Sequence, residues 1–200
     1  MRRDPASAAT SASELVRLAR EHDLTMFRAF ALFFEGWATA SRGEPGGLED
    51  MRRGVDLLRE QNVLQFDGLL KIALAEAEAW AGDPDHAVVI LDEALATIER
   101  TGYRAFEAEL YRARGEILLK REAADPALAE EALQTAIALA RRQGTRSFEL
   151  RAALALAKLY QSTGRPADAH GVLAPALEGF APTPEMPEIA EAQALIERLA

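Results

Sequence analysis

The sequence contains no cysteine, which excludes disulfide bonds, thiolate metal sites and cysteine nucleophiles. It also has no run of roughly 18 apolar residues, so we expect no segment to span a membrane. β-Branched residues are sparse, which argues against a sheet. The N-terminal segment carries basic residues without the apolar stretch of a signal peptide. These absences favour a helical protein of the cytoplasm.

Positive charge is also in deficit, because 23 Lys and Arg residues face 32 Asp and Glu residues and the formal net charge is −9. An acidic chain repels a phosphate backbone, so we do not expect this chain to contact nucleic acid. The basic pairs are scattered along the chain. Most fall near helix C-termini, which favour cations, and Arg52-Arg53 is expected to be solvated in the middle of a helix.

Alanine and leucine dominate the sequence, with Glu and Arg between them, and this composition is typical of stacked helices. Residues that tolerate a left-handed backbone at a helix end recur at intervals of 39, 40 and 42 residues. These residues are Asp23, Asn62, Gly102 and Gly144. A turn that leads into a proline follows each stop. The turns are Gly43-Glu44-Pro45, Gly82-Asp83-Pro84, Ala124-Asp125-Pro126 and Gly164-Arg165-Pro166.

Small residues also recur at fixed distances from these stops. Small side chains let two helix backbones approach to roughly 8–10 Å, so each interval predicts a helix hairpin. A single hairpin cannot bury its own apolar face, and its neighbours must therefore stack on it. The small sets are Gly36/Gly47/Gly54, Ala75/Ala87/Ala94, Gly115/Ala129/Ala136 and Ala157/Ala169/Ala176.

The repeats divide the chain into four full hairpins with an extra helix at each end. The predicted segments are a leading half-repeat 1–23, repeats 24–62, 63–102, 103–144 and 145–181, and a capping helix within 182–200. The leading helix, residues 5–22, lacks the first helix of its unit, which predicts either a longer parent protein or pairing with another molecule. Near the other end, Pro175, Pro182, Pro184 and Pro187 interrupt the pattern. They predict a loop over 178–184 and a helix over 185–199.

The small sets resemble the tetratricopeptide repeat, which has small residues at its eighth, twentieth and twenty-seventh positions. The resemblance implies an all-α, right-handed superhelical solenoid of helix hairpins with a C-terminal capping helix. The units here are longer than the family's, which are about 34 residues.

Three segments carry a wider resemblance, FEAELYRARGEILL, ALARRQGTRSFELRAALALAKLYQSTGR and VLAPALEGF. They look like the C-terminal repeats of large bacterial proteins that join a nucleotide-cyclase or transcriptional-activator domain to a predicted regulatory ATPase. In such proteins the repeats serve as a sensor or docking arm. The catalytic motifs of those proteins do not occur in this sequence.

The sequence shows no catalytic constellation. His22, His86 and His170 are far apart and lack the spacing of a metal motif. No glycine-rich phosphate loop is present, and the serines have no nearby histidine to act as a base. We therefore expect no metal, no cofactor and no enzymatic activity.

The family resemblance places partner contacts on the first helix of each hairpin, in a groove that changes from aromatic to charged along the chain. The implied groove residues are Phe30, Phe33, Trp37, Leu69, Ile72, Glu76, Glu109, Arg112, Glu116, Arg151, Leu154 and Lys158. In the alternative interpretation the aromatic residues are core, buried against the N-terminal helix. Glu116 stands where a family clamp for terminal carboxylates needs asparagine, so a peptide with an apolar and a basic part suits this groove better.

These observations predict a non-catalytic interaction or sensor scaffold, the arm of a larger bacterial signalling protein, that binds a peptide or a partner domain. Two alternatives remain open. The first is a homodimerisation module that pairs through the helix of residues 5–22. The second is a regulatory domain that senses a small ligand in the groove.

Overall fold

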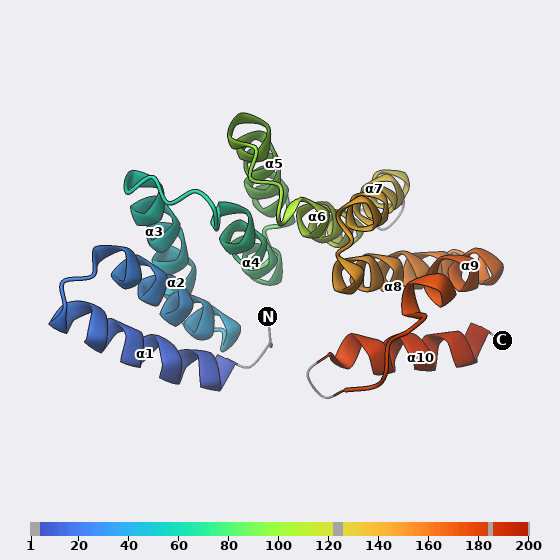
Figure 1. Ribbon diagram of the computed structural model, residues 1–200, viewed down its shortest axis with the longest axis horizontal. Coiled ribbons are helices and arrows are strands. Elements are labelled where there is room, and N and C mark those ends of the chain that lie inside the picture. The colour runs from blue at the N-terminus through green and yellow to red at the C-terminus, as the bar shows by residue number, and fades with distance from the viewer. Residues whose placement is uncertain (1–4, 122–125, 184–185, 200) are drawn as a thin grey trace. The chain divides into compact units, whose positions relative to one another are not determined.

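The computed structural model describes residues 5–121, 126–183 and 186–199. Within these ranges the regular structure consists of ten α-helices and no strand, which confirms the all-α prediction there (Figure 1). The chain forms two compact units, Met1–Arg104 and Ala105–Ala200. No helix in the described ranges combines the length and the apolarity needed to cross a bilayer.

The first unit contains five helices. They are α1 (Pro5–Glu21), α2 (Thr25–Ser41), α3 (Gly47–Glu60), α4 (Asp67–Trp80) and α5 (Pro84–Thr101). Each helix packs against the next one in the chain, and α2 also contacts α4. The predicted leading helix is α1, and its buried residues Ala12 and Ala19 face α2. The two predicted hairpins of this unit are α2–α3 and α4–α5.

The second unit also contains five helices. They are α6 (Glu107–Arg121), α7 (Ala127–Gln143), α8 (Arg146–Ser162), α9 (Pro166–Leu177) and α10 (Pro187–Leu199). Its core joins residues of α7, α8, α9 and α10, including Leu133, Leu150, Leu173 and Leu195. The C-terminal helix α10 packs against both α8 and α9, as expected of a cap.

One detail near the C-terminus differs from the sequence prediction, the start of the last helix. The helix α9 ends at Leu177, in agreement with a loop from residue 178, and Pro175 lies inside it. The carbonyl that Pro175 leaves without a helical partner belongs to exposed Gly171, where water can satisfy it, and the helix ends two residues later. The last helix begins at Pro187, a favourable first position, and Met186, which was expected to be helical, lies before it. Ala124 and Asp125 of one predicted turn, and Pro184 of the predicted loop, lie outside the described residues.

The predicted helix stops adopt the left-handed conformation. The backbone angle φ is 50° at Asp23, 57° at Asn62, 76° at Gly102 and 68° at Gly144. The turn before α5 also behaves as expected, because the Asp83 carboxylate accepts a hydrogen bond of 2.9 Å from the backbone N–H of His86. The stops and this cap confirm the predicted ends of these helices.

The small residues lie at the helix contacts. A Cβ atom added to Gly36 would stand 2.6 Å from the carbonyl oxygen of Gly47, so α2 and α3 approach backbone to backbone. A Cβ atom added to Gly115 would stand 2.6 Å from Cγ of Leu133, which fills the space between α6 and α7. The recurring glycines therefore set the distance between the helices of a hairpin.

Candidate functional site

Of the six groove residues expected in the first unit, three are buried in its core and three are partly buried. Phe33 is fully buried and Trp37 is 8% exposed. Phe30 is partly buried and meets Phe66 edge to face, with 5.5 Å between the ring centroids. On α4, Ile72 is buried, whereas Leu69 and Glu76 are partly buried. Phe33 and Trp37 are thus core residues, as in the alternative interpretation, but the ring contact of Phe30 is with Phe66 before α4, where that interpretation expected the N-terminal helix.

The groove residues expected on α6 form a buried ion network. Arg112 is 2% exposed, and its Nε donates to Glu109 Oε1 at 3.1 Å. Its Nη1 donates to Glu116 Oε2 at 2.8 Å. Glu109 is itself buried. Both carboxylates stand three or four residues from the arginine on the same helix face, so they neutralise it within the fold.

The expected residues of α8 extend this network to α10. Arg151 pairs with Glu109 at 2.6 Å and with Glu188 of α10 at 3.5 Å. Lys158 pairs with Glu191 of α10 at 2.7 Å. Leu154, between them, is buried. All five charged positions predicted for a partner in this unit therefore have partners inside the unit.

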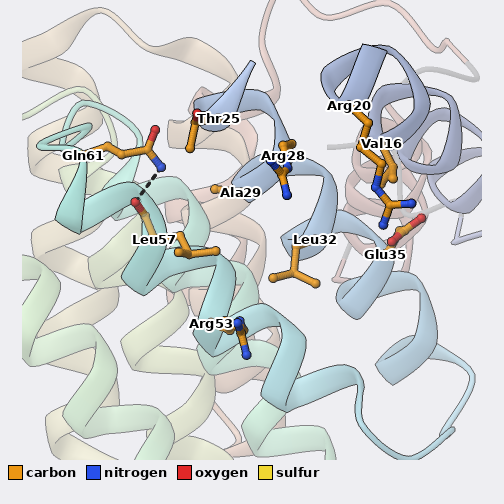
Figure 2. Close-up of a pocket in the computed structure, with 10 residues that line it drawn as sticks. All are labelled: Val16, Arg20, Thr25, Arg28, Ala29, Leu32, Glu35, Arg53, Leu57 and Gln61. Carbon is orange, nitrogen blue, oxygen red and sulfur yellow. Dashed lines mark hydrogen bonds between the residues drawn. The ribbon is translucent and has the colours of Figure 1, made fainter. Parts of the chain in front are cut away.

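A cavity that the sequence did not reveal lies in the first unit. Its volume is about 470 Å³, within the range of ligand-binding sites (Figure 2). Helices α1 and α3 both pack against α2, and no described residue of α1 contacts α3, so α2 forms the floor between two walls. The lining residues are Val16, Arg20, Thr25, Arg28, Ala29, Leu32, Glu35, Arg53, Leu57 and Gln61.

The cavity uses a different face of α2 from the predicted groove. Its α2 residues include Arg28, Leu32 and Glu35, spaced three or four residues apart. At about 100° of rotation per residue, their mean direction is about 150° from that of Phe33 and Trp37. Phe33 packs against Gly54 of α3, and Phe30 meets Phe66 before α4, whereas the side of Arg28, Leu32 and Glu35 lines the cavity.

The middle of the cavity is apolar. Leu32 and Leu57 are partly buried, and Ala29 beneath them is fully buried. Figure 2 shows Leu32 between Arg28 and Arg53. An apolar surface framed by a few polar groups is the usual composition of a binding site.

Three exposed arginines surround this apolar centre. Across the described ranges, no side chain forms an ion pair or a hydrogen bond with the guanidinium groups of Arg20, Arg28 or Arg53. Arg53 has acidic neighbours on its own helix at the spacings that form ion pairs, Glu49 four residues before it and Asp56 three residues after it, and it pairs with neither. The guanidinium donors are thus available to a ligand.

The position of Arg28 is unfavourable for its helix. It is the fourth residue of α2, and a cation in the first turn opposes the helix dipole. Arg20, by contrast, lies in the last turn of α1, where a cation is favourable. A residue that lowers local stability at an open cavity is more readily explained by binding than by folding.

One carboxylate lies among the three arginines. The Ser13 hydroxyl donates to Glu35 Oε1 at 3.4 Å, a contact between α1 and α2. In Figure 2, Glu35 and Arg20 share one end of the cavity, away from Gln61. The lining therefore carries an excess of positive charge in a chain whose formal net charge is −9. Such a local excess attracts anions.

The outer face of α1 carries a charged ladder. Arg17 contacts Glu14 at 2.6 Å and Glu21 at 2.7 Å, and all three side chains are about half exposed. The hydrogen bond from Arg17 holds the pKa of Glu14 below its usual value. This polar face differs from the apolar stripe by which helices usually self-associate.

No family model matches the sequence. Over 154 residues the chain is 28% identical to Uncharacterized protein R02095 of Rhizobium meliloti (strain 1021). This segment is 76% of the present chain and 15% of that protein, so the chain spans a small part of the curated relative that it matches.

Proposed function

We propose that this chain is a non-catalytic helical-repeat module that binds a short segment of a partner protein in the cavity between α1 and α3. We further propose that its hairpins are TPR-like and stack as a right-handed superhelical solenoid. The left-handed helix stops and the glycine contacts at Gly36 and Gly115 support this architecture. They are the features that space the helices of such repeats.

The cavity carries the functional proposal. Its apolar centre of Leu32 and Leu57 is accessible, and the arginines around it lack partners among the described residues. Apolar anchors give an interface most of its affinity, and charges around them select the partner. The cavity is a trough with α2 as its floor and α1 and α3 as its walls, and this shape suits a short segment lying along it.

The setting of the module is also a proposal. The resemblance to the C-terminal repeats of large bacterial proteins, and the much greater length of the Rhizobium relative, support a place within a larger cytoplasmic signalling or regulatory protein. In that setting the module would recruit or sense a partner, and chemistry would belong to other domains.

Selection from a library of random 12-residue peptides displayed on phage tests the function. The wild-type chain should enrich peptides that lose binding to a Leu32→Trp variant, because the indole would fill the centre of the trough. Leu128→Trp, at an exposed residue of α7 in the second unit, is the matched control and should bind as wild type does. Enriched peptides that bind Leu32→Trp undiminished would contradict the assigned surface, and a failure to enrich any peptide would contradict peptide binding.

A small-ligand sensor is the second candidate, and the volume of the cavity, about 470 Å³, favours it. The peptide selection separates the two candidates, because a sensor would bind a small molecule at this cavity and enrich no peptide.

A further inference from the structure

We infer that the occupant of the trough is an acidic segment of a partner protein, in which an apolar side chain lies on Leu32 and Leu57 and carboxylates beside it reach Arg28 and Arg53. The inference rests on the proposed function and adds the chemistry of the partner. It also differs from the sequence expectation of a peptide with an apolar and a basic part, which relied on Glu116, a residue that pairs with Arg112.

The charges of the trough call for an anionic partner. Arg20, Arg28 and Arg53 repel one another across a shared cavity, and Glu35 is the only acidic residue among the lining residues. A carboxylate that enters relieves this repulsion. It also accepts two parallel hydrogen bonds from a guanidinium group, a geometry that arginine provides and lysine does not.

The apolar centre narrows the choice of anion. Leu32 lies between Arg28 and Arg53 in Figure 2, so a ligand that reaches both arginines must cross an apolar surface. A purely ionic group such as inorganic phosphate leaves that apolar surface exposed to water. A segment with an apolar side chain between two acidic ones covers it and gains the free energy of burial.

Glu35 sets the orientation of the segment. Its carboxylate shares one end of the trough with Arg20, and a third acidic side chain there would meet a like charge. The acidic groups of the segment therefore belong at Arg28 and Arg53. The end with Arg20 and Glu35 suits a neutral polar residue.

Fluorescence anisotropy with three labelled peptides tests this chemistry on the full chain. The first peptide contains three Asp-Leu-Asp triplets separated by Ser-Gly. In the second, asparagine replaces each aspartate, and in the third, serine replaces each leucine. We expect the first peptide to bind about tenfold more tightly than either of the others, and its affinity to fall as salt is raised, because exposed charges are screened.

The protein variants locate the charges. Arg28→Gln should weaken the binding of the acidic peptide by roughly threefold. Arg28→Gln together with Arg53→Gln should weaken it by roughly tenfold, as expected for partly exposed ion pairs. Arg17→Gln, on the outer face of α1, is the matched control and should change nothing. Arg53→Glu should bind a peptide of Lys-Leu-Lys triplets more tightly than the wild-type chain does.

Three results would overturn the inference. They are equal binding of the asparagine peptide, undiminished binding by the double variant, and binding of a double-stranded DNA oligomer that the double variant loses while no peptide binds. If the acidic peptide fails but library-selected peptides still depend on Leu32, the proposed function stands and only the chemistry of the partner is wrong.

Discussion

Two groups of arginines, one in each unit, have opposite environments. In the second unit, Arg112 is buried between Glu109 and Glu116, and Arg151 joins α6 to α10. In the first unit, Arg28 and Arg53 frame an open cavity and have no partner among the described side chains. The same residue type thus completes the fold in one unit and leaves charge available for binding in the other.

The difference follows from where the acidic residues lie. Helix α6 places carboxylates three residues before and four residues after Arg112, on the face that α8 covers. In the trough, Arg53 forms an ion pair with neither Glu49 nor Asp56, and α1 contributes no carboxylate to the lining. Buried charges must be paired to be tolerated, whereas exposed charges are hydrated and can bind an external partner.

Removal of Arg112 should have the largest effect on stability. Arg112→Ala should lower the free energy of unfolding by about 3–5 kcal/mol, because it leaves buried Glu109 without one of its cations. Urea unfolding followed by circular dichroism measures this change. Lys158→Ala, which breaks the half-exposed pair with Glu191, should cost less than about 1 kcal/mol. Equal costs for the two variants would show that the buried network is not structurally important.

The next largest change in the free energy of unfolding is expected where a glycine allows two helices to approach. Gly36→Ala should lower the free energy of unfolding by about 1–3 kcal/mol, because the new Cβ meets the backbone of Gly47 and Met51. Gly115→Ala in the second unit should cost less, since there the Cβ meets the side chain of Leu133, which can shift.

Gly171→Ala is the control for this contact. The added Cβ meets no atom within 4 Å, and the residue lies in α9. The substitution should therefore raise the free energy of unfolding by about 0.4–1 kcal/mol. The three variants are compared by their urea midpoints. A neutral Gly36→Ala would mean that α2 and α3 do not approach as closely as the structure shows.

The smallest effects are expected at the trough and have opposite signs. Arg28→Gln should raise the free energy of unfolding by about 0.3–1 kcal/mol, because it removes a cation from the first turn of α2. Arg20→Gln should lower it by a similar amount, because Arg20 lies in the last turn of α1. Urea midpoints at low salt reveal the difference. A clear loss of stability in Arg28→Gln would indicate that Arg28 serves the fold and not a ligand.

Local features of the fold were predictable because they depend on short stretches of chain. Asp23 and Asn62 end helices with positive φ angles, and Gly36 and Gly115 lie where two helices approach. The backbone conformation and side-chain size required at such positions recur in each repeat. Pro175 can lie inside α9 because a proline near a helix end removes a hydrogen bond only from a carbonyl that water can reach.

The candidate site was less accessible to sequence reasoning. The sequence pointed to Phe33 and Trp37, which the structure buries, and treated Arg53 as an ordinary solvated residue. One signal was available, since Arg28 stands in the first turn of a predicted helix, where a cation is unfavourable. Its connection to Arg53 depends on the way α1 and α3 flank α2, and no spacing along the chain encodes that arrangement directly.

The sequence by itself determined that this chain consists of helix hairpins, where most of its helices end and which small residues lie between them. Periodicity and left-handed stops are properties of neighbouring residues, so they can be read along the chain. Only the tertiary structure decided which charges are neutralised and which remain free. Ion pairing depends on distances between side chains of different helices, and α10 supplies Glu188 to Arg151 while no described residue supplies a carboxylate to Arg28.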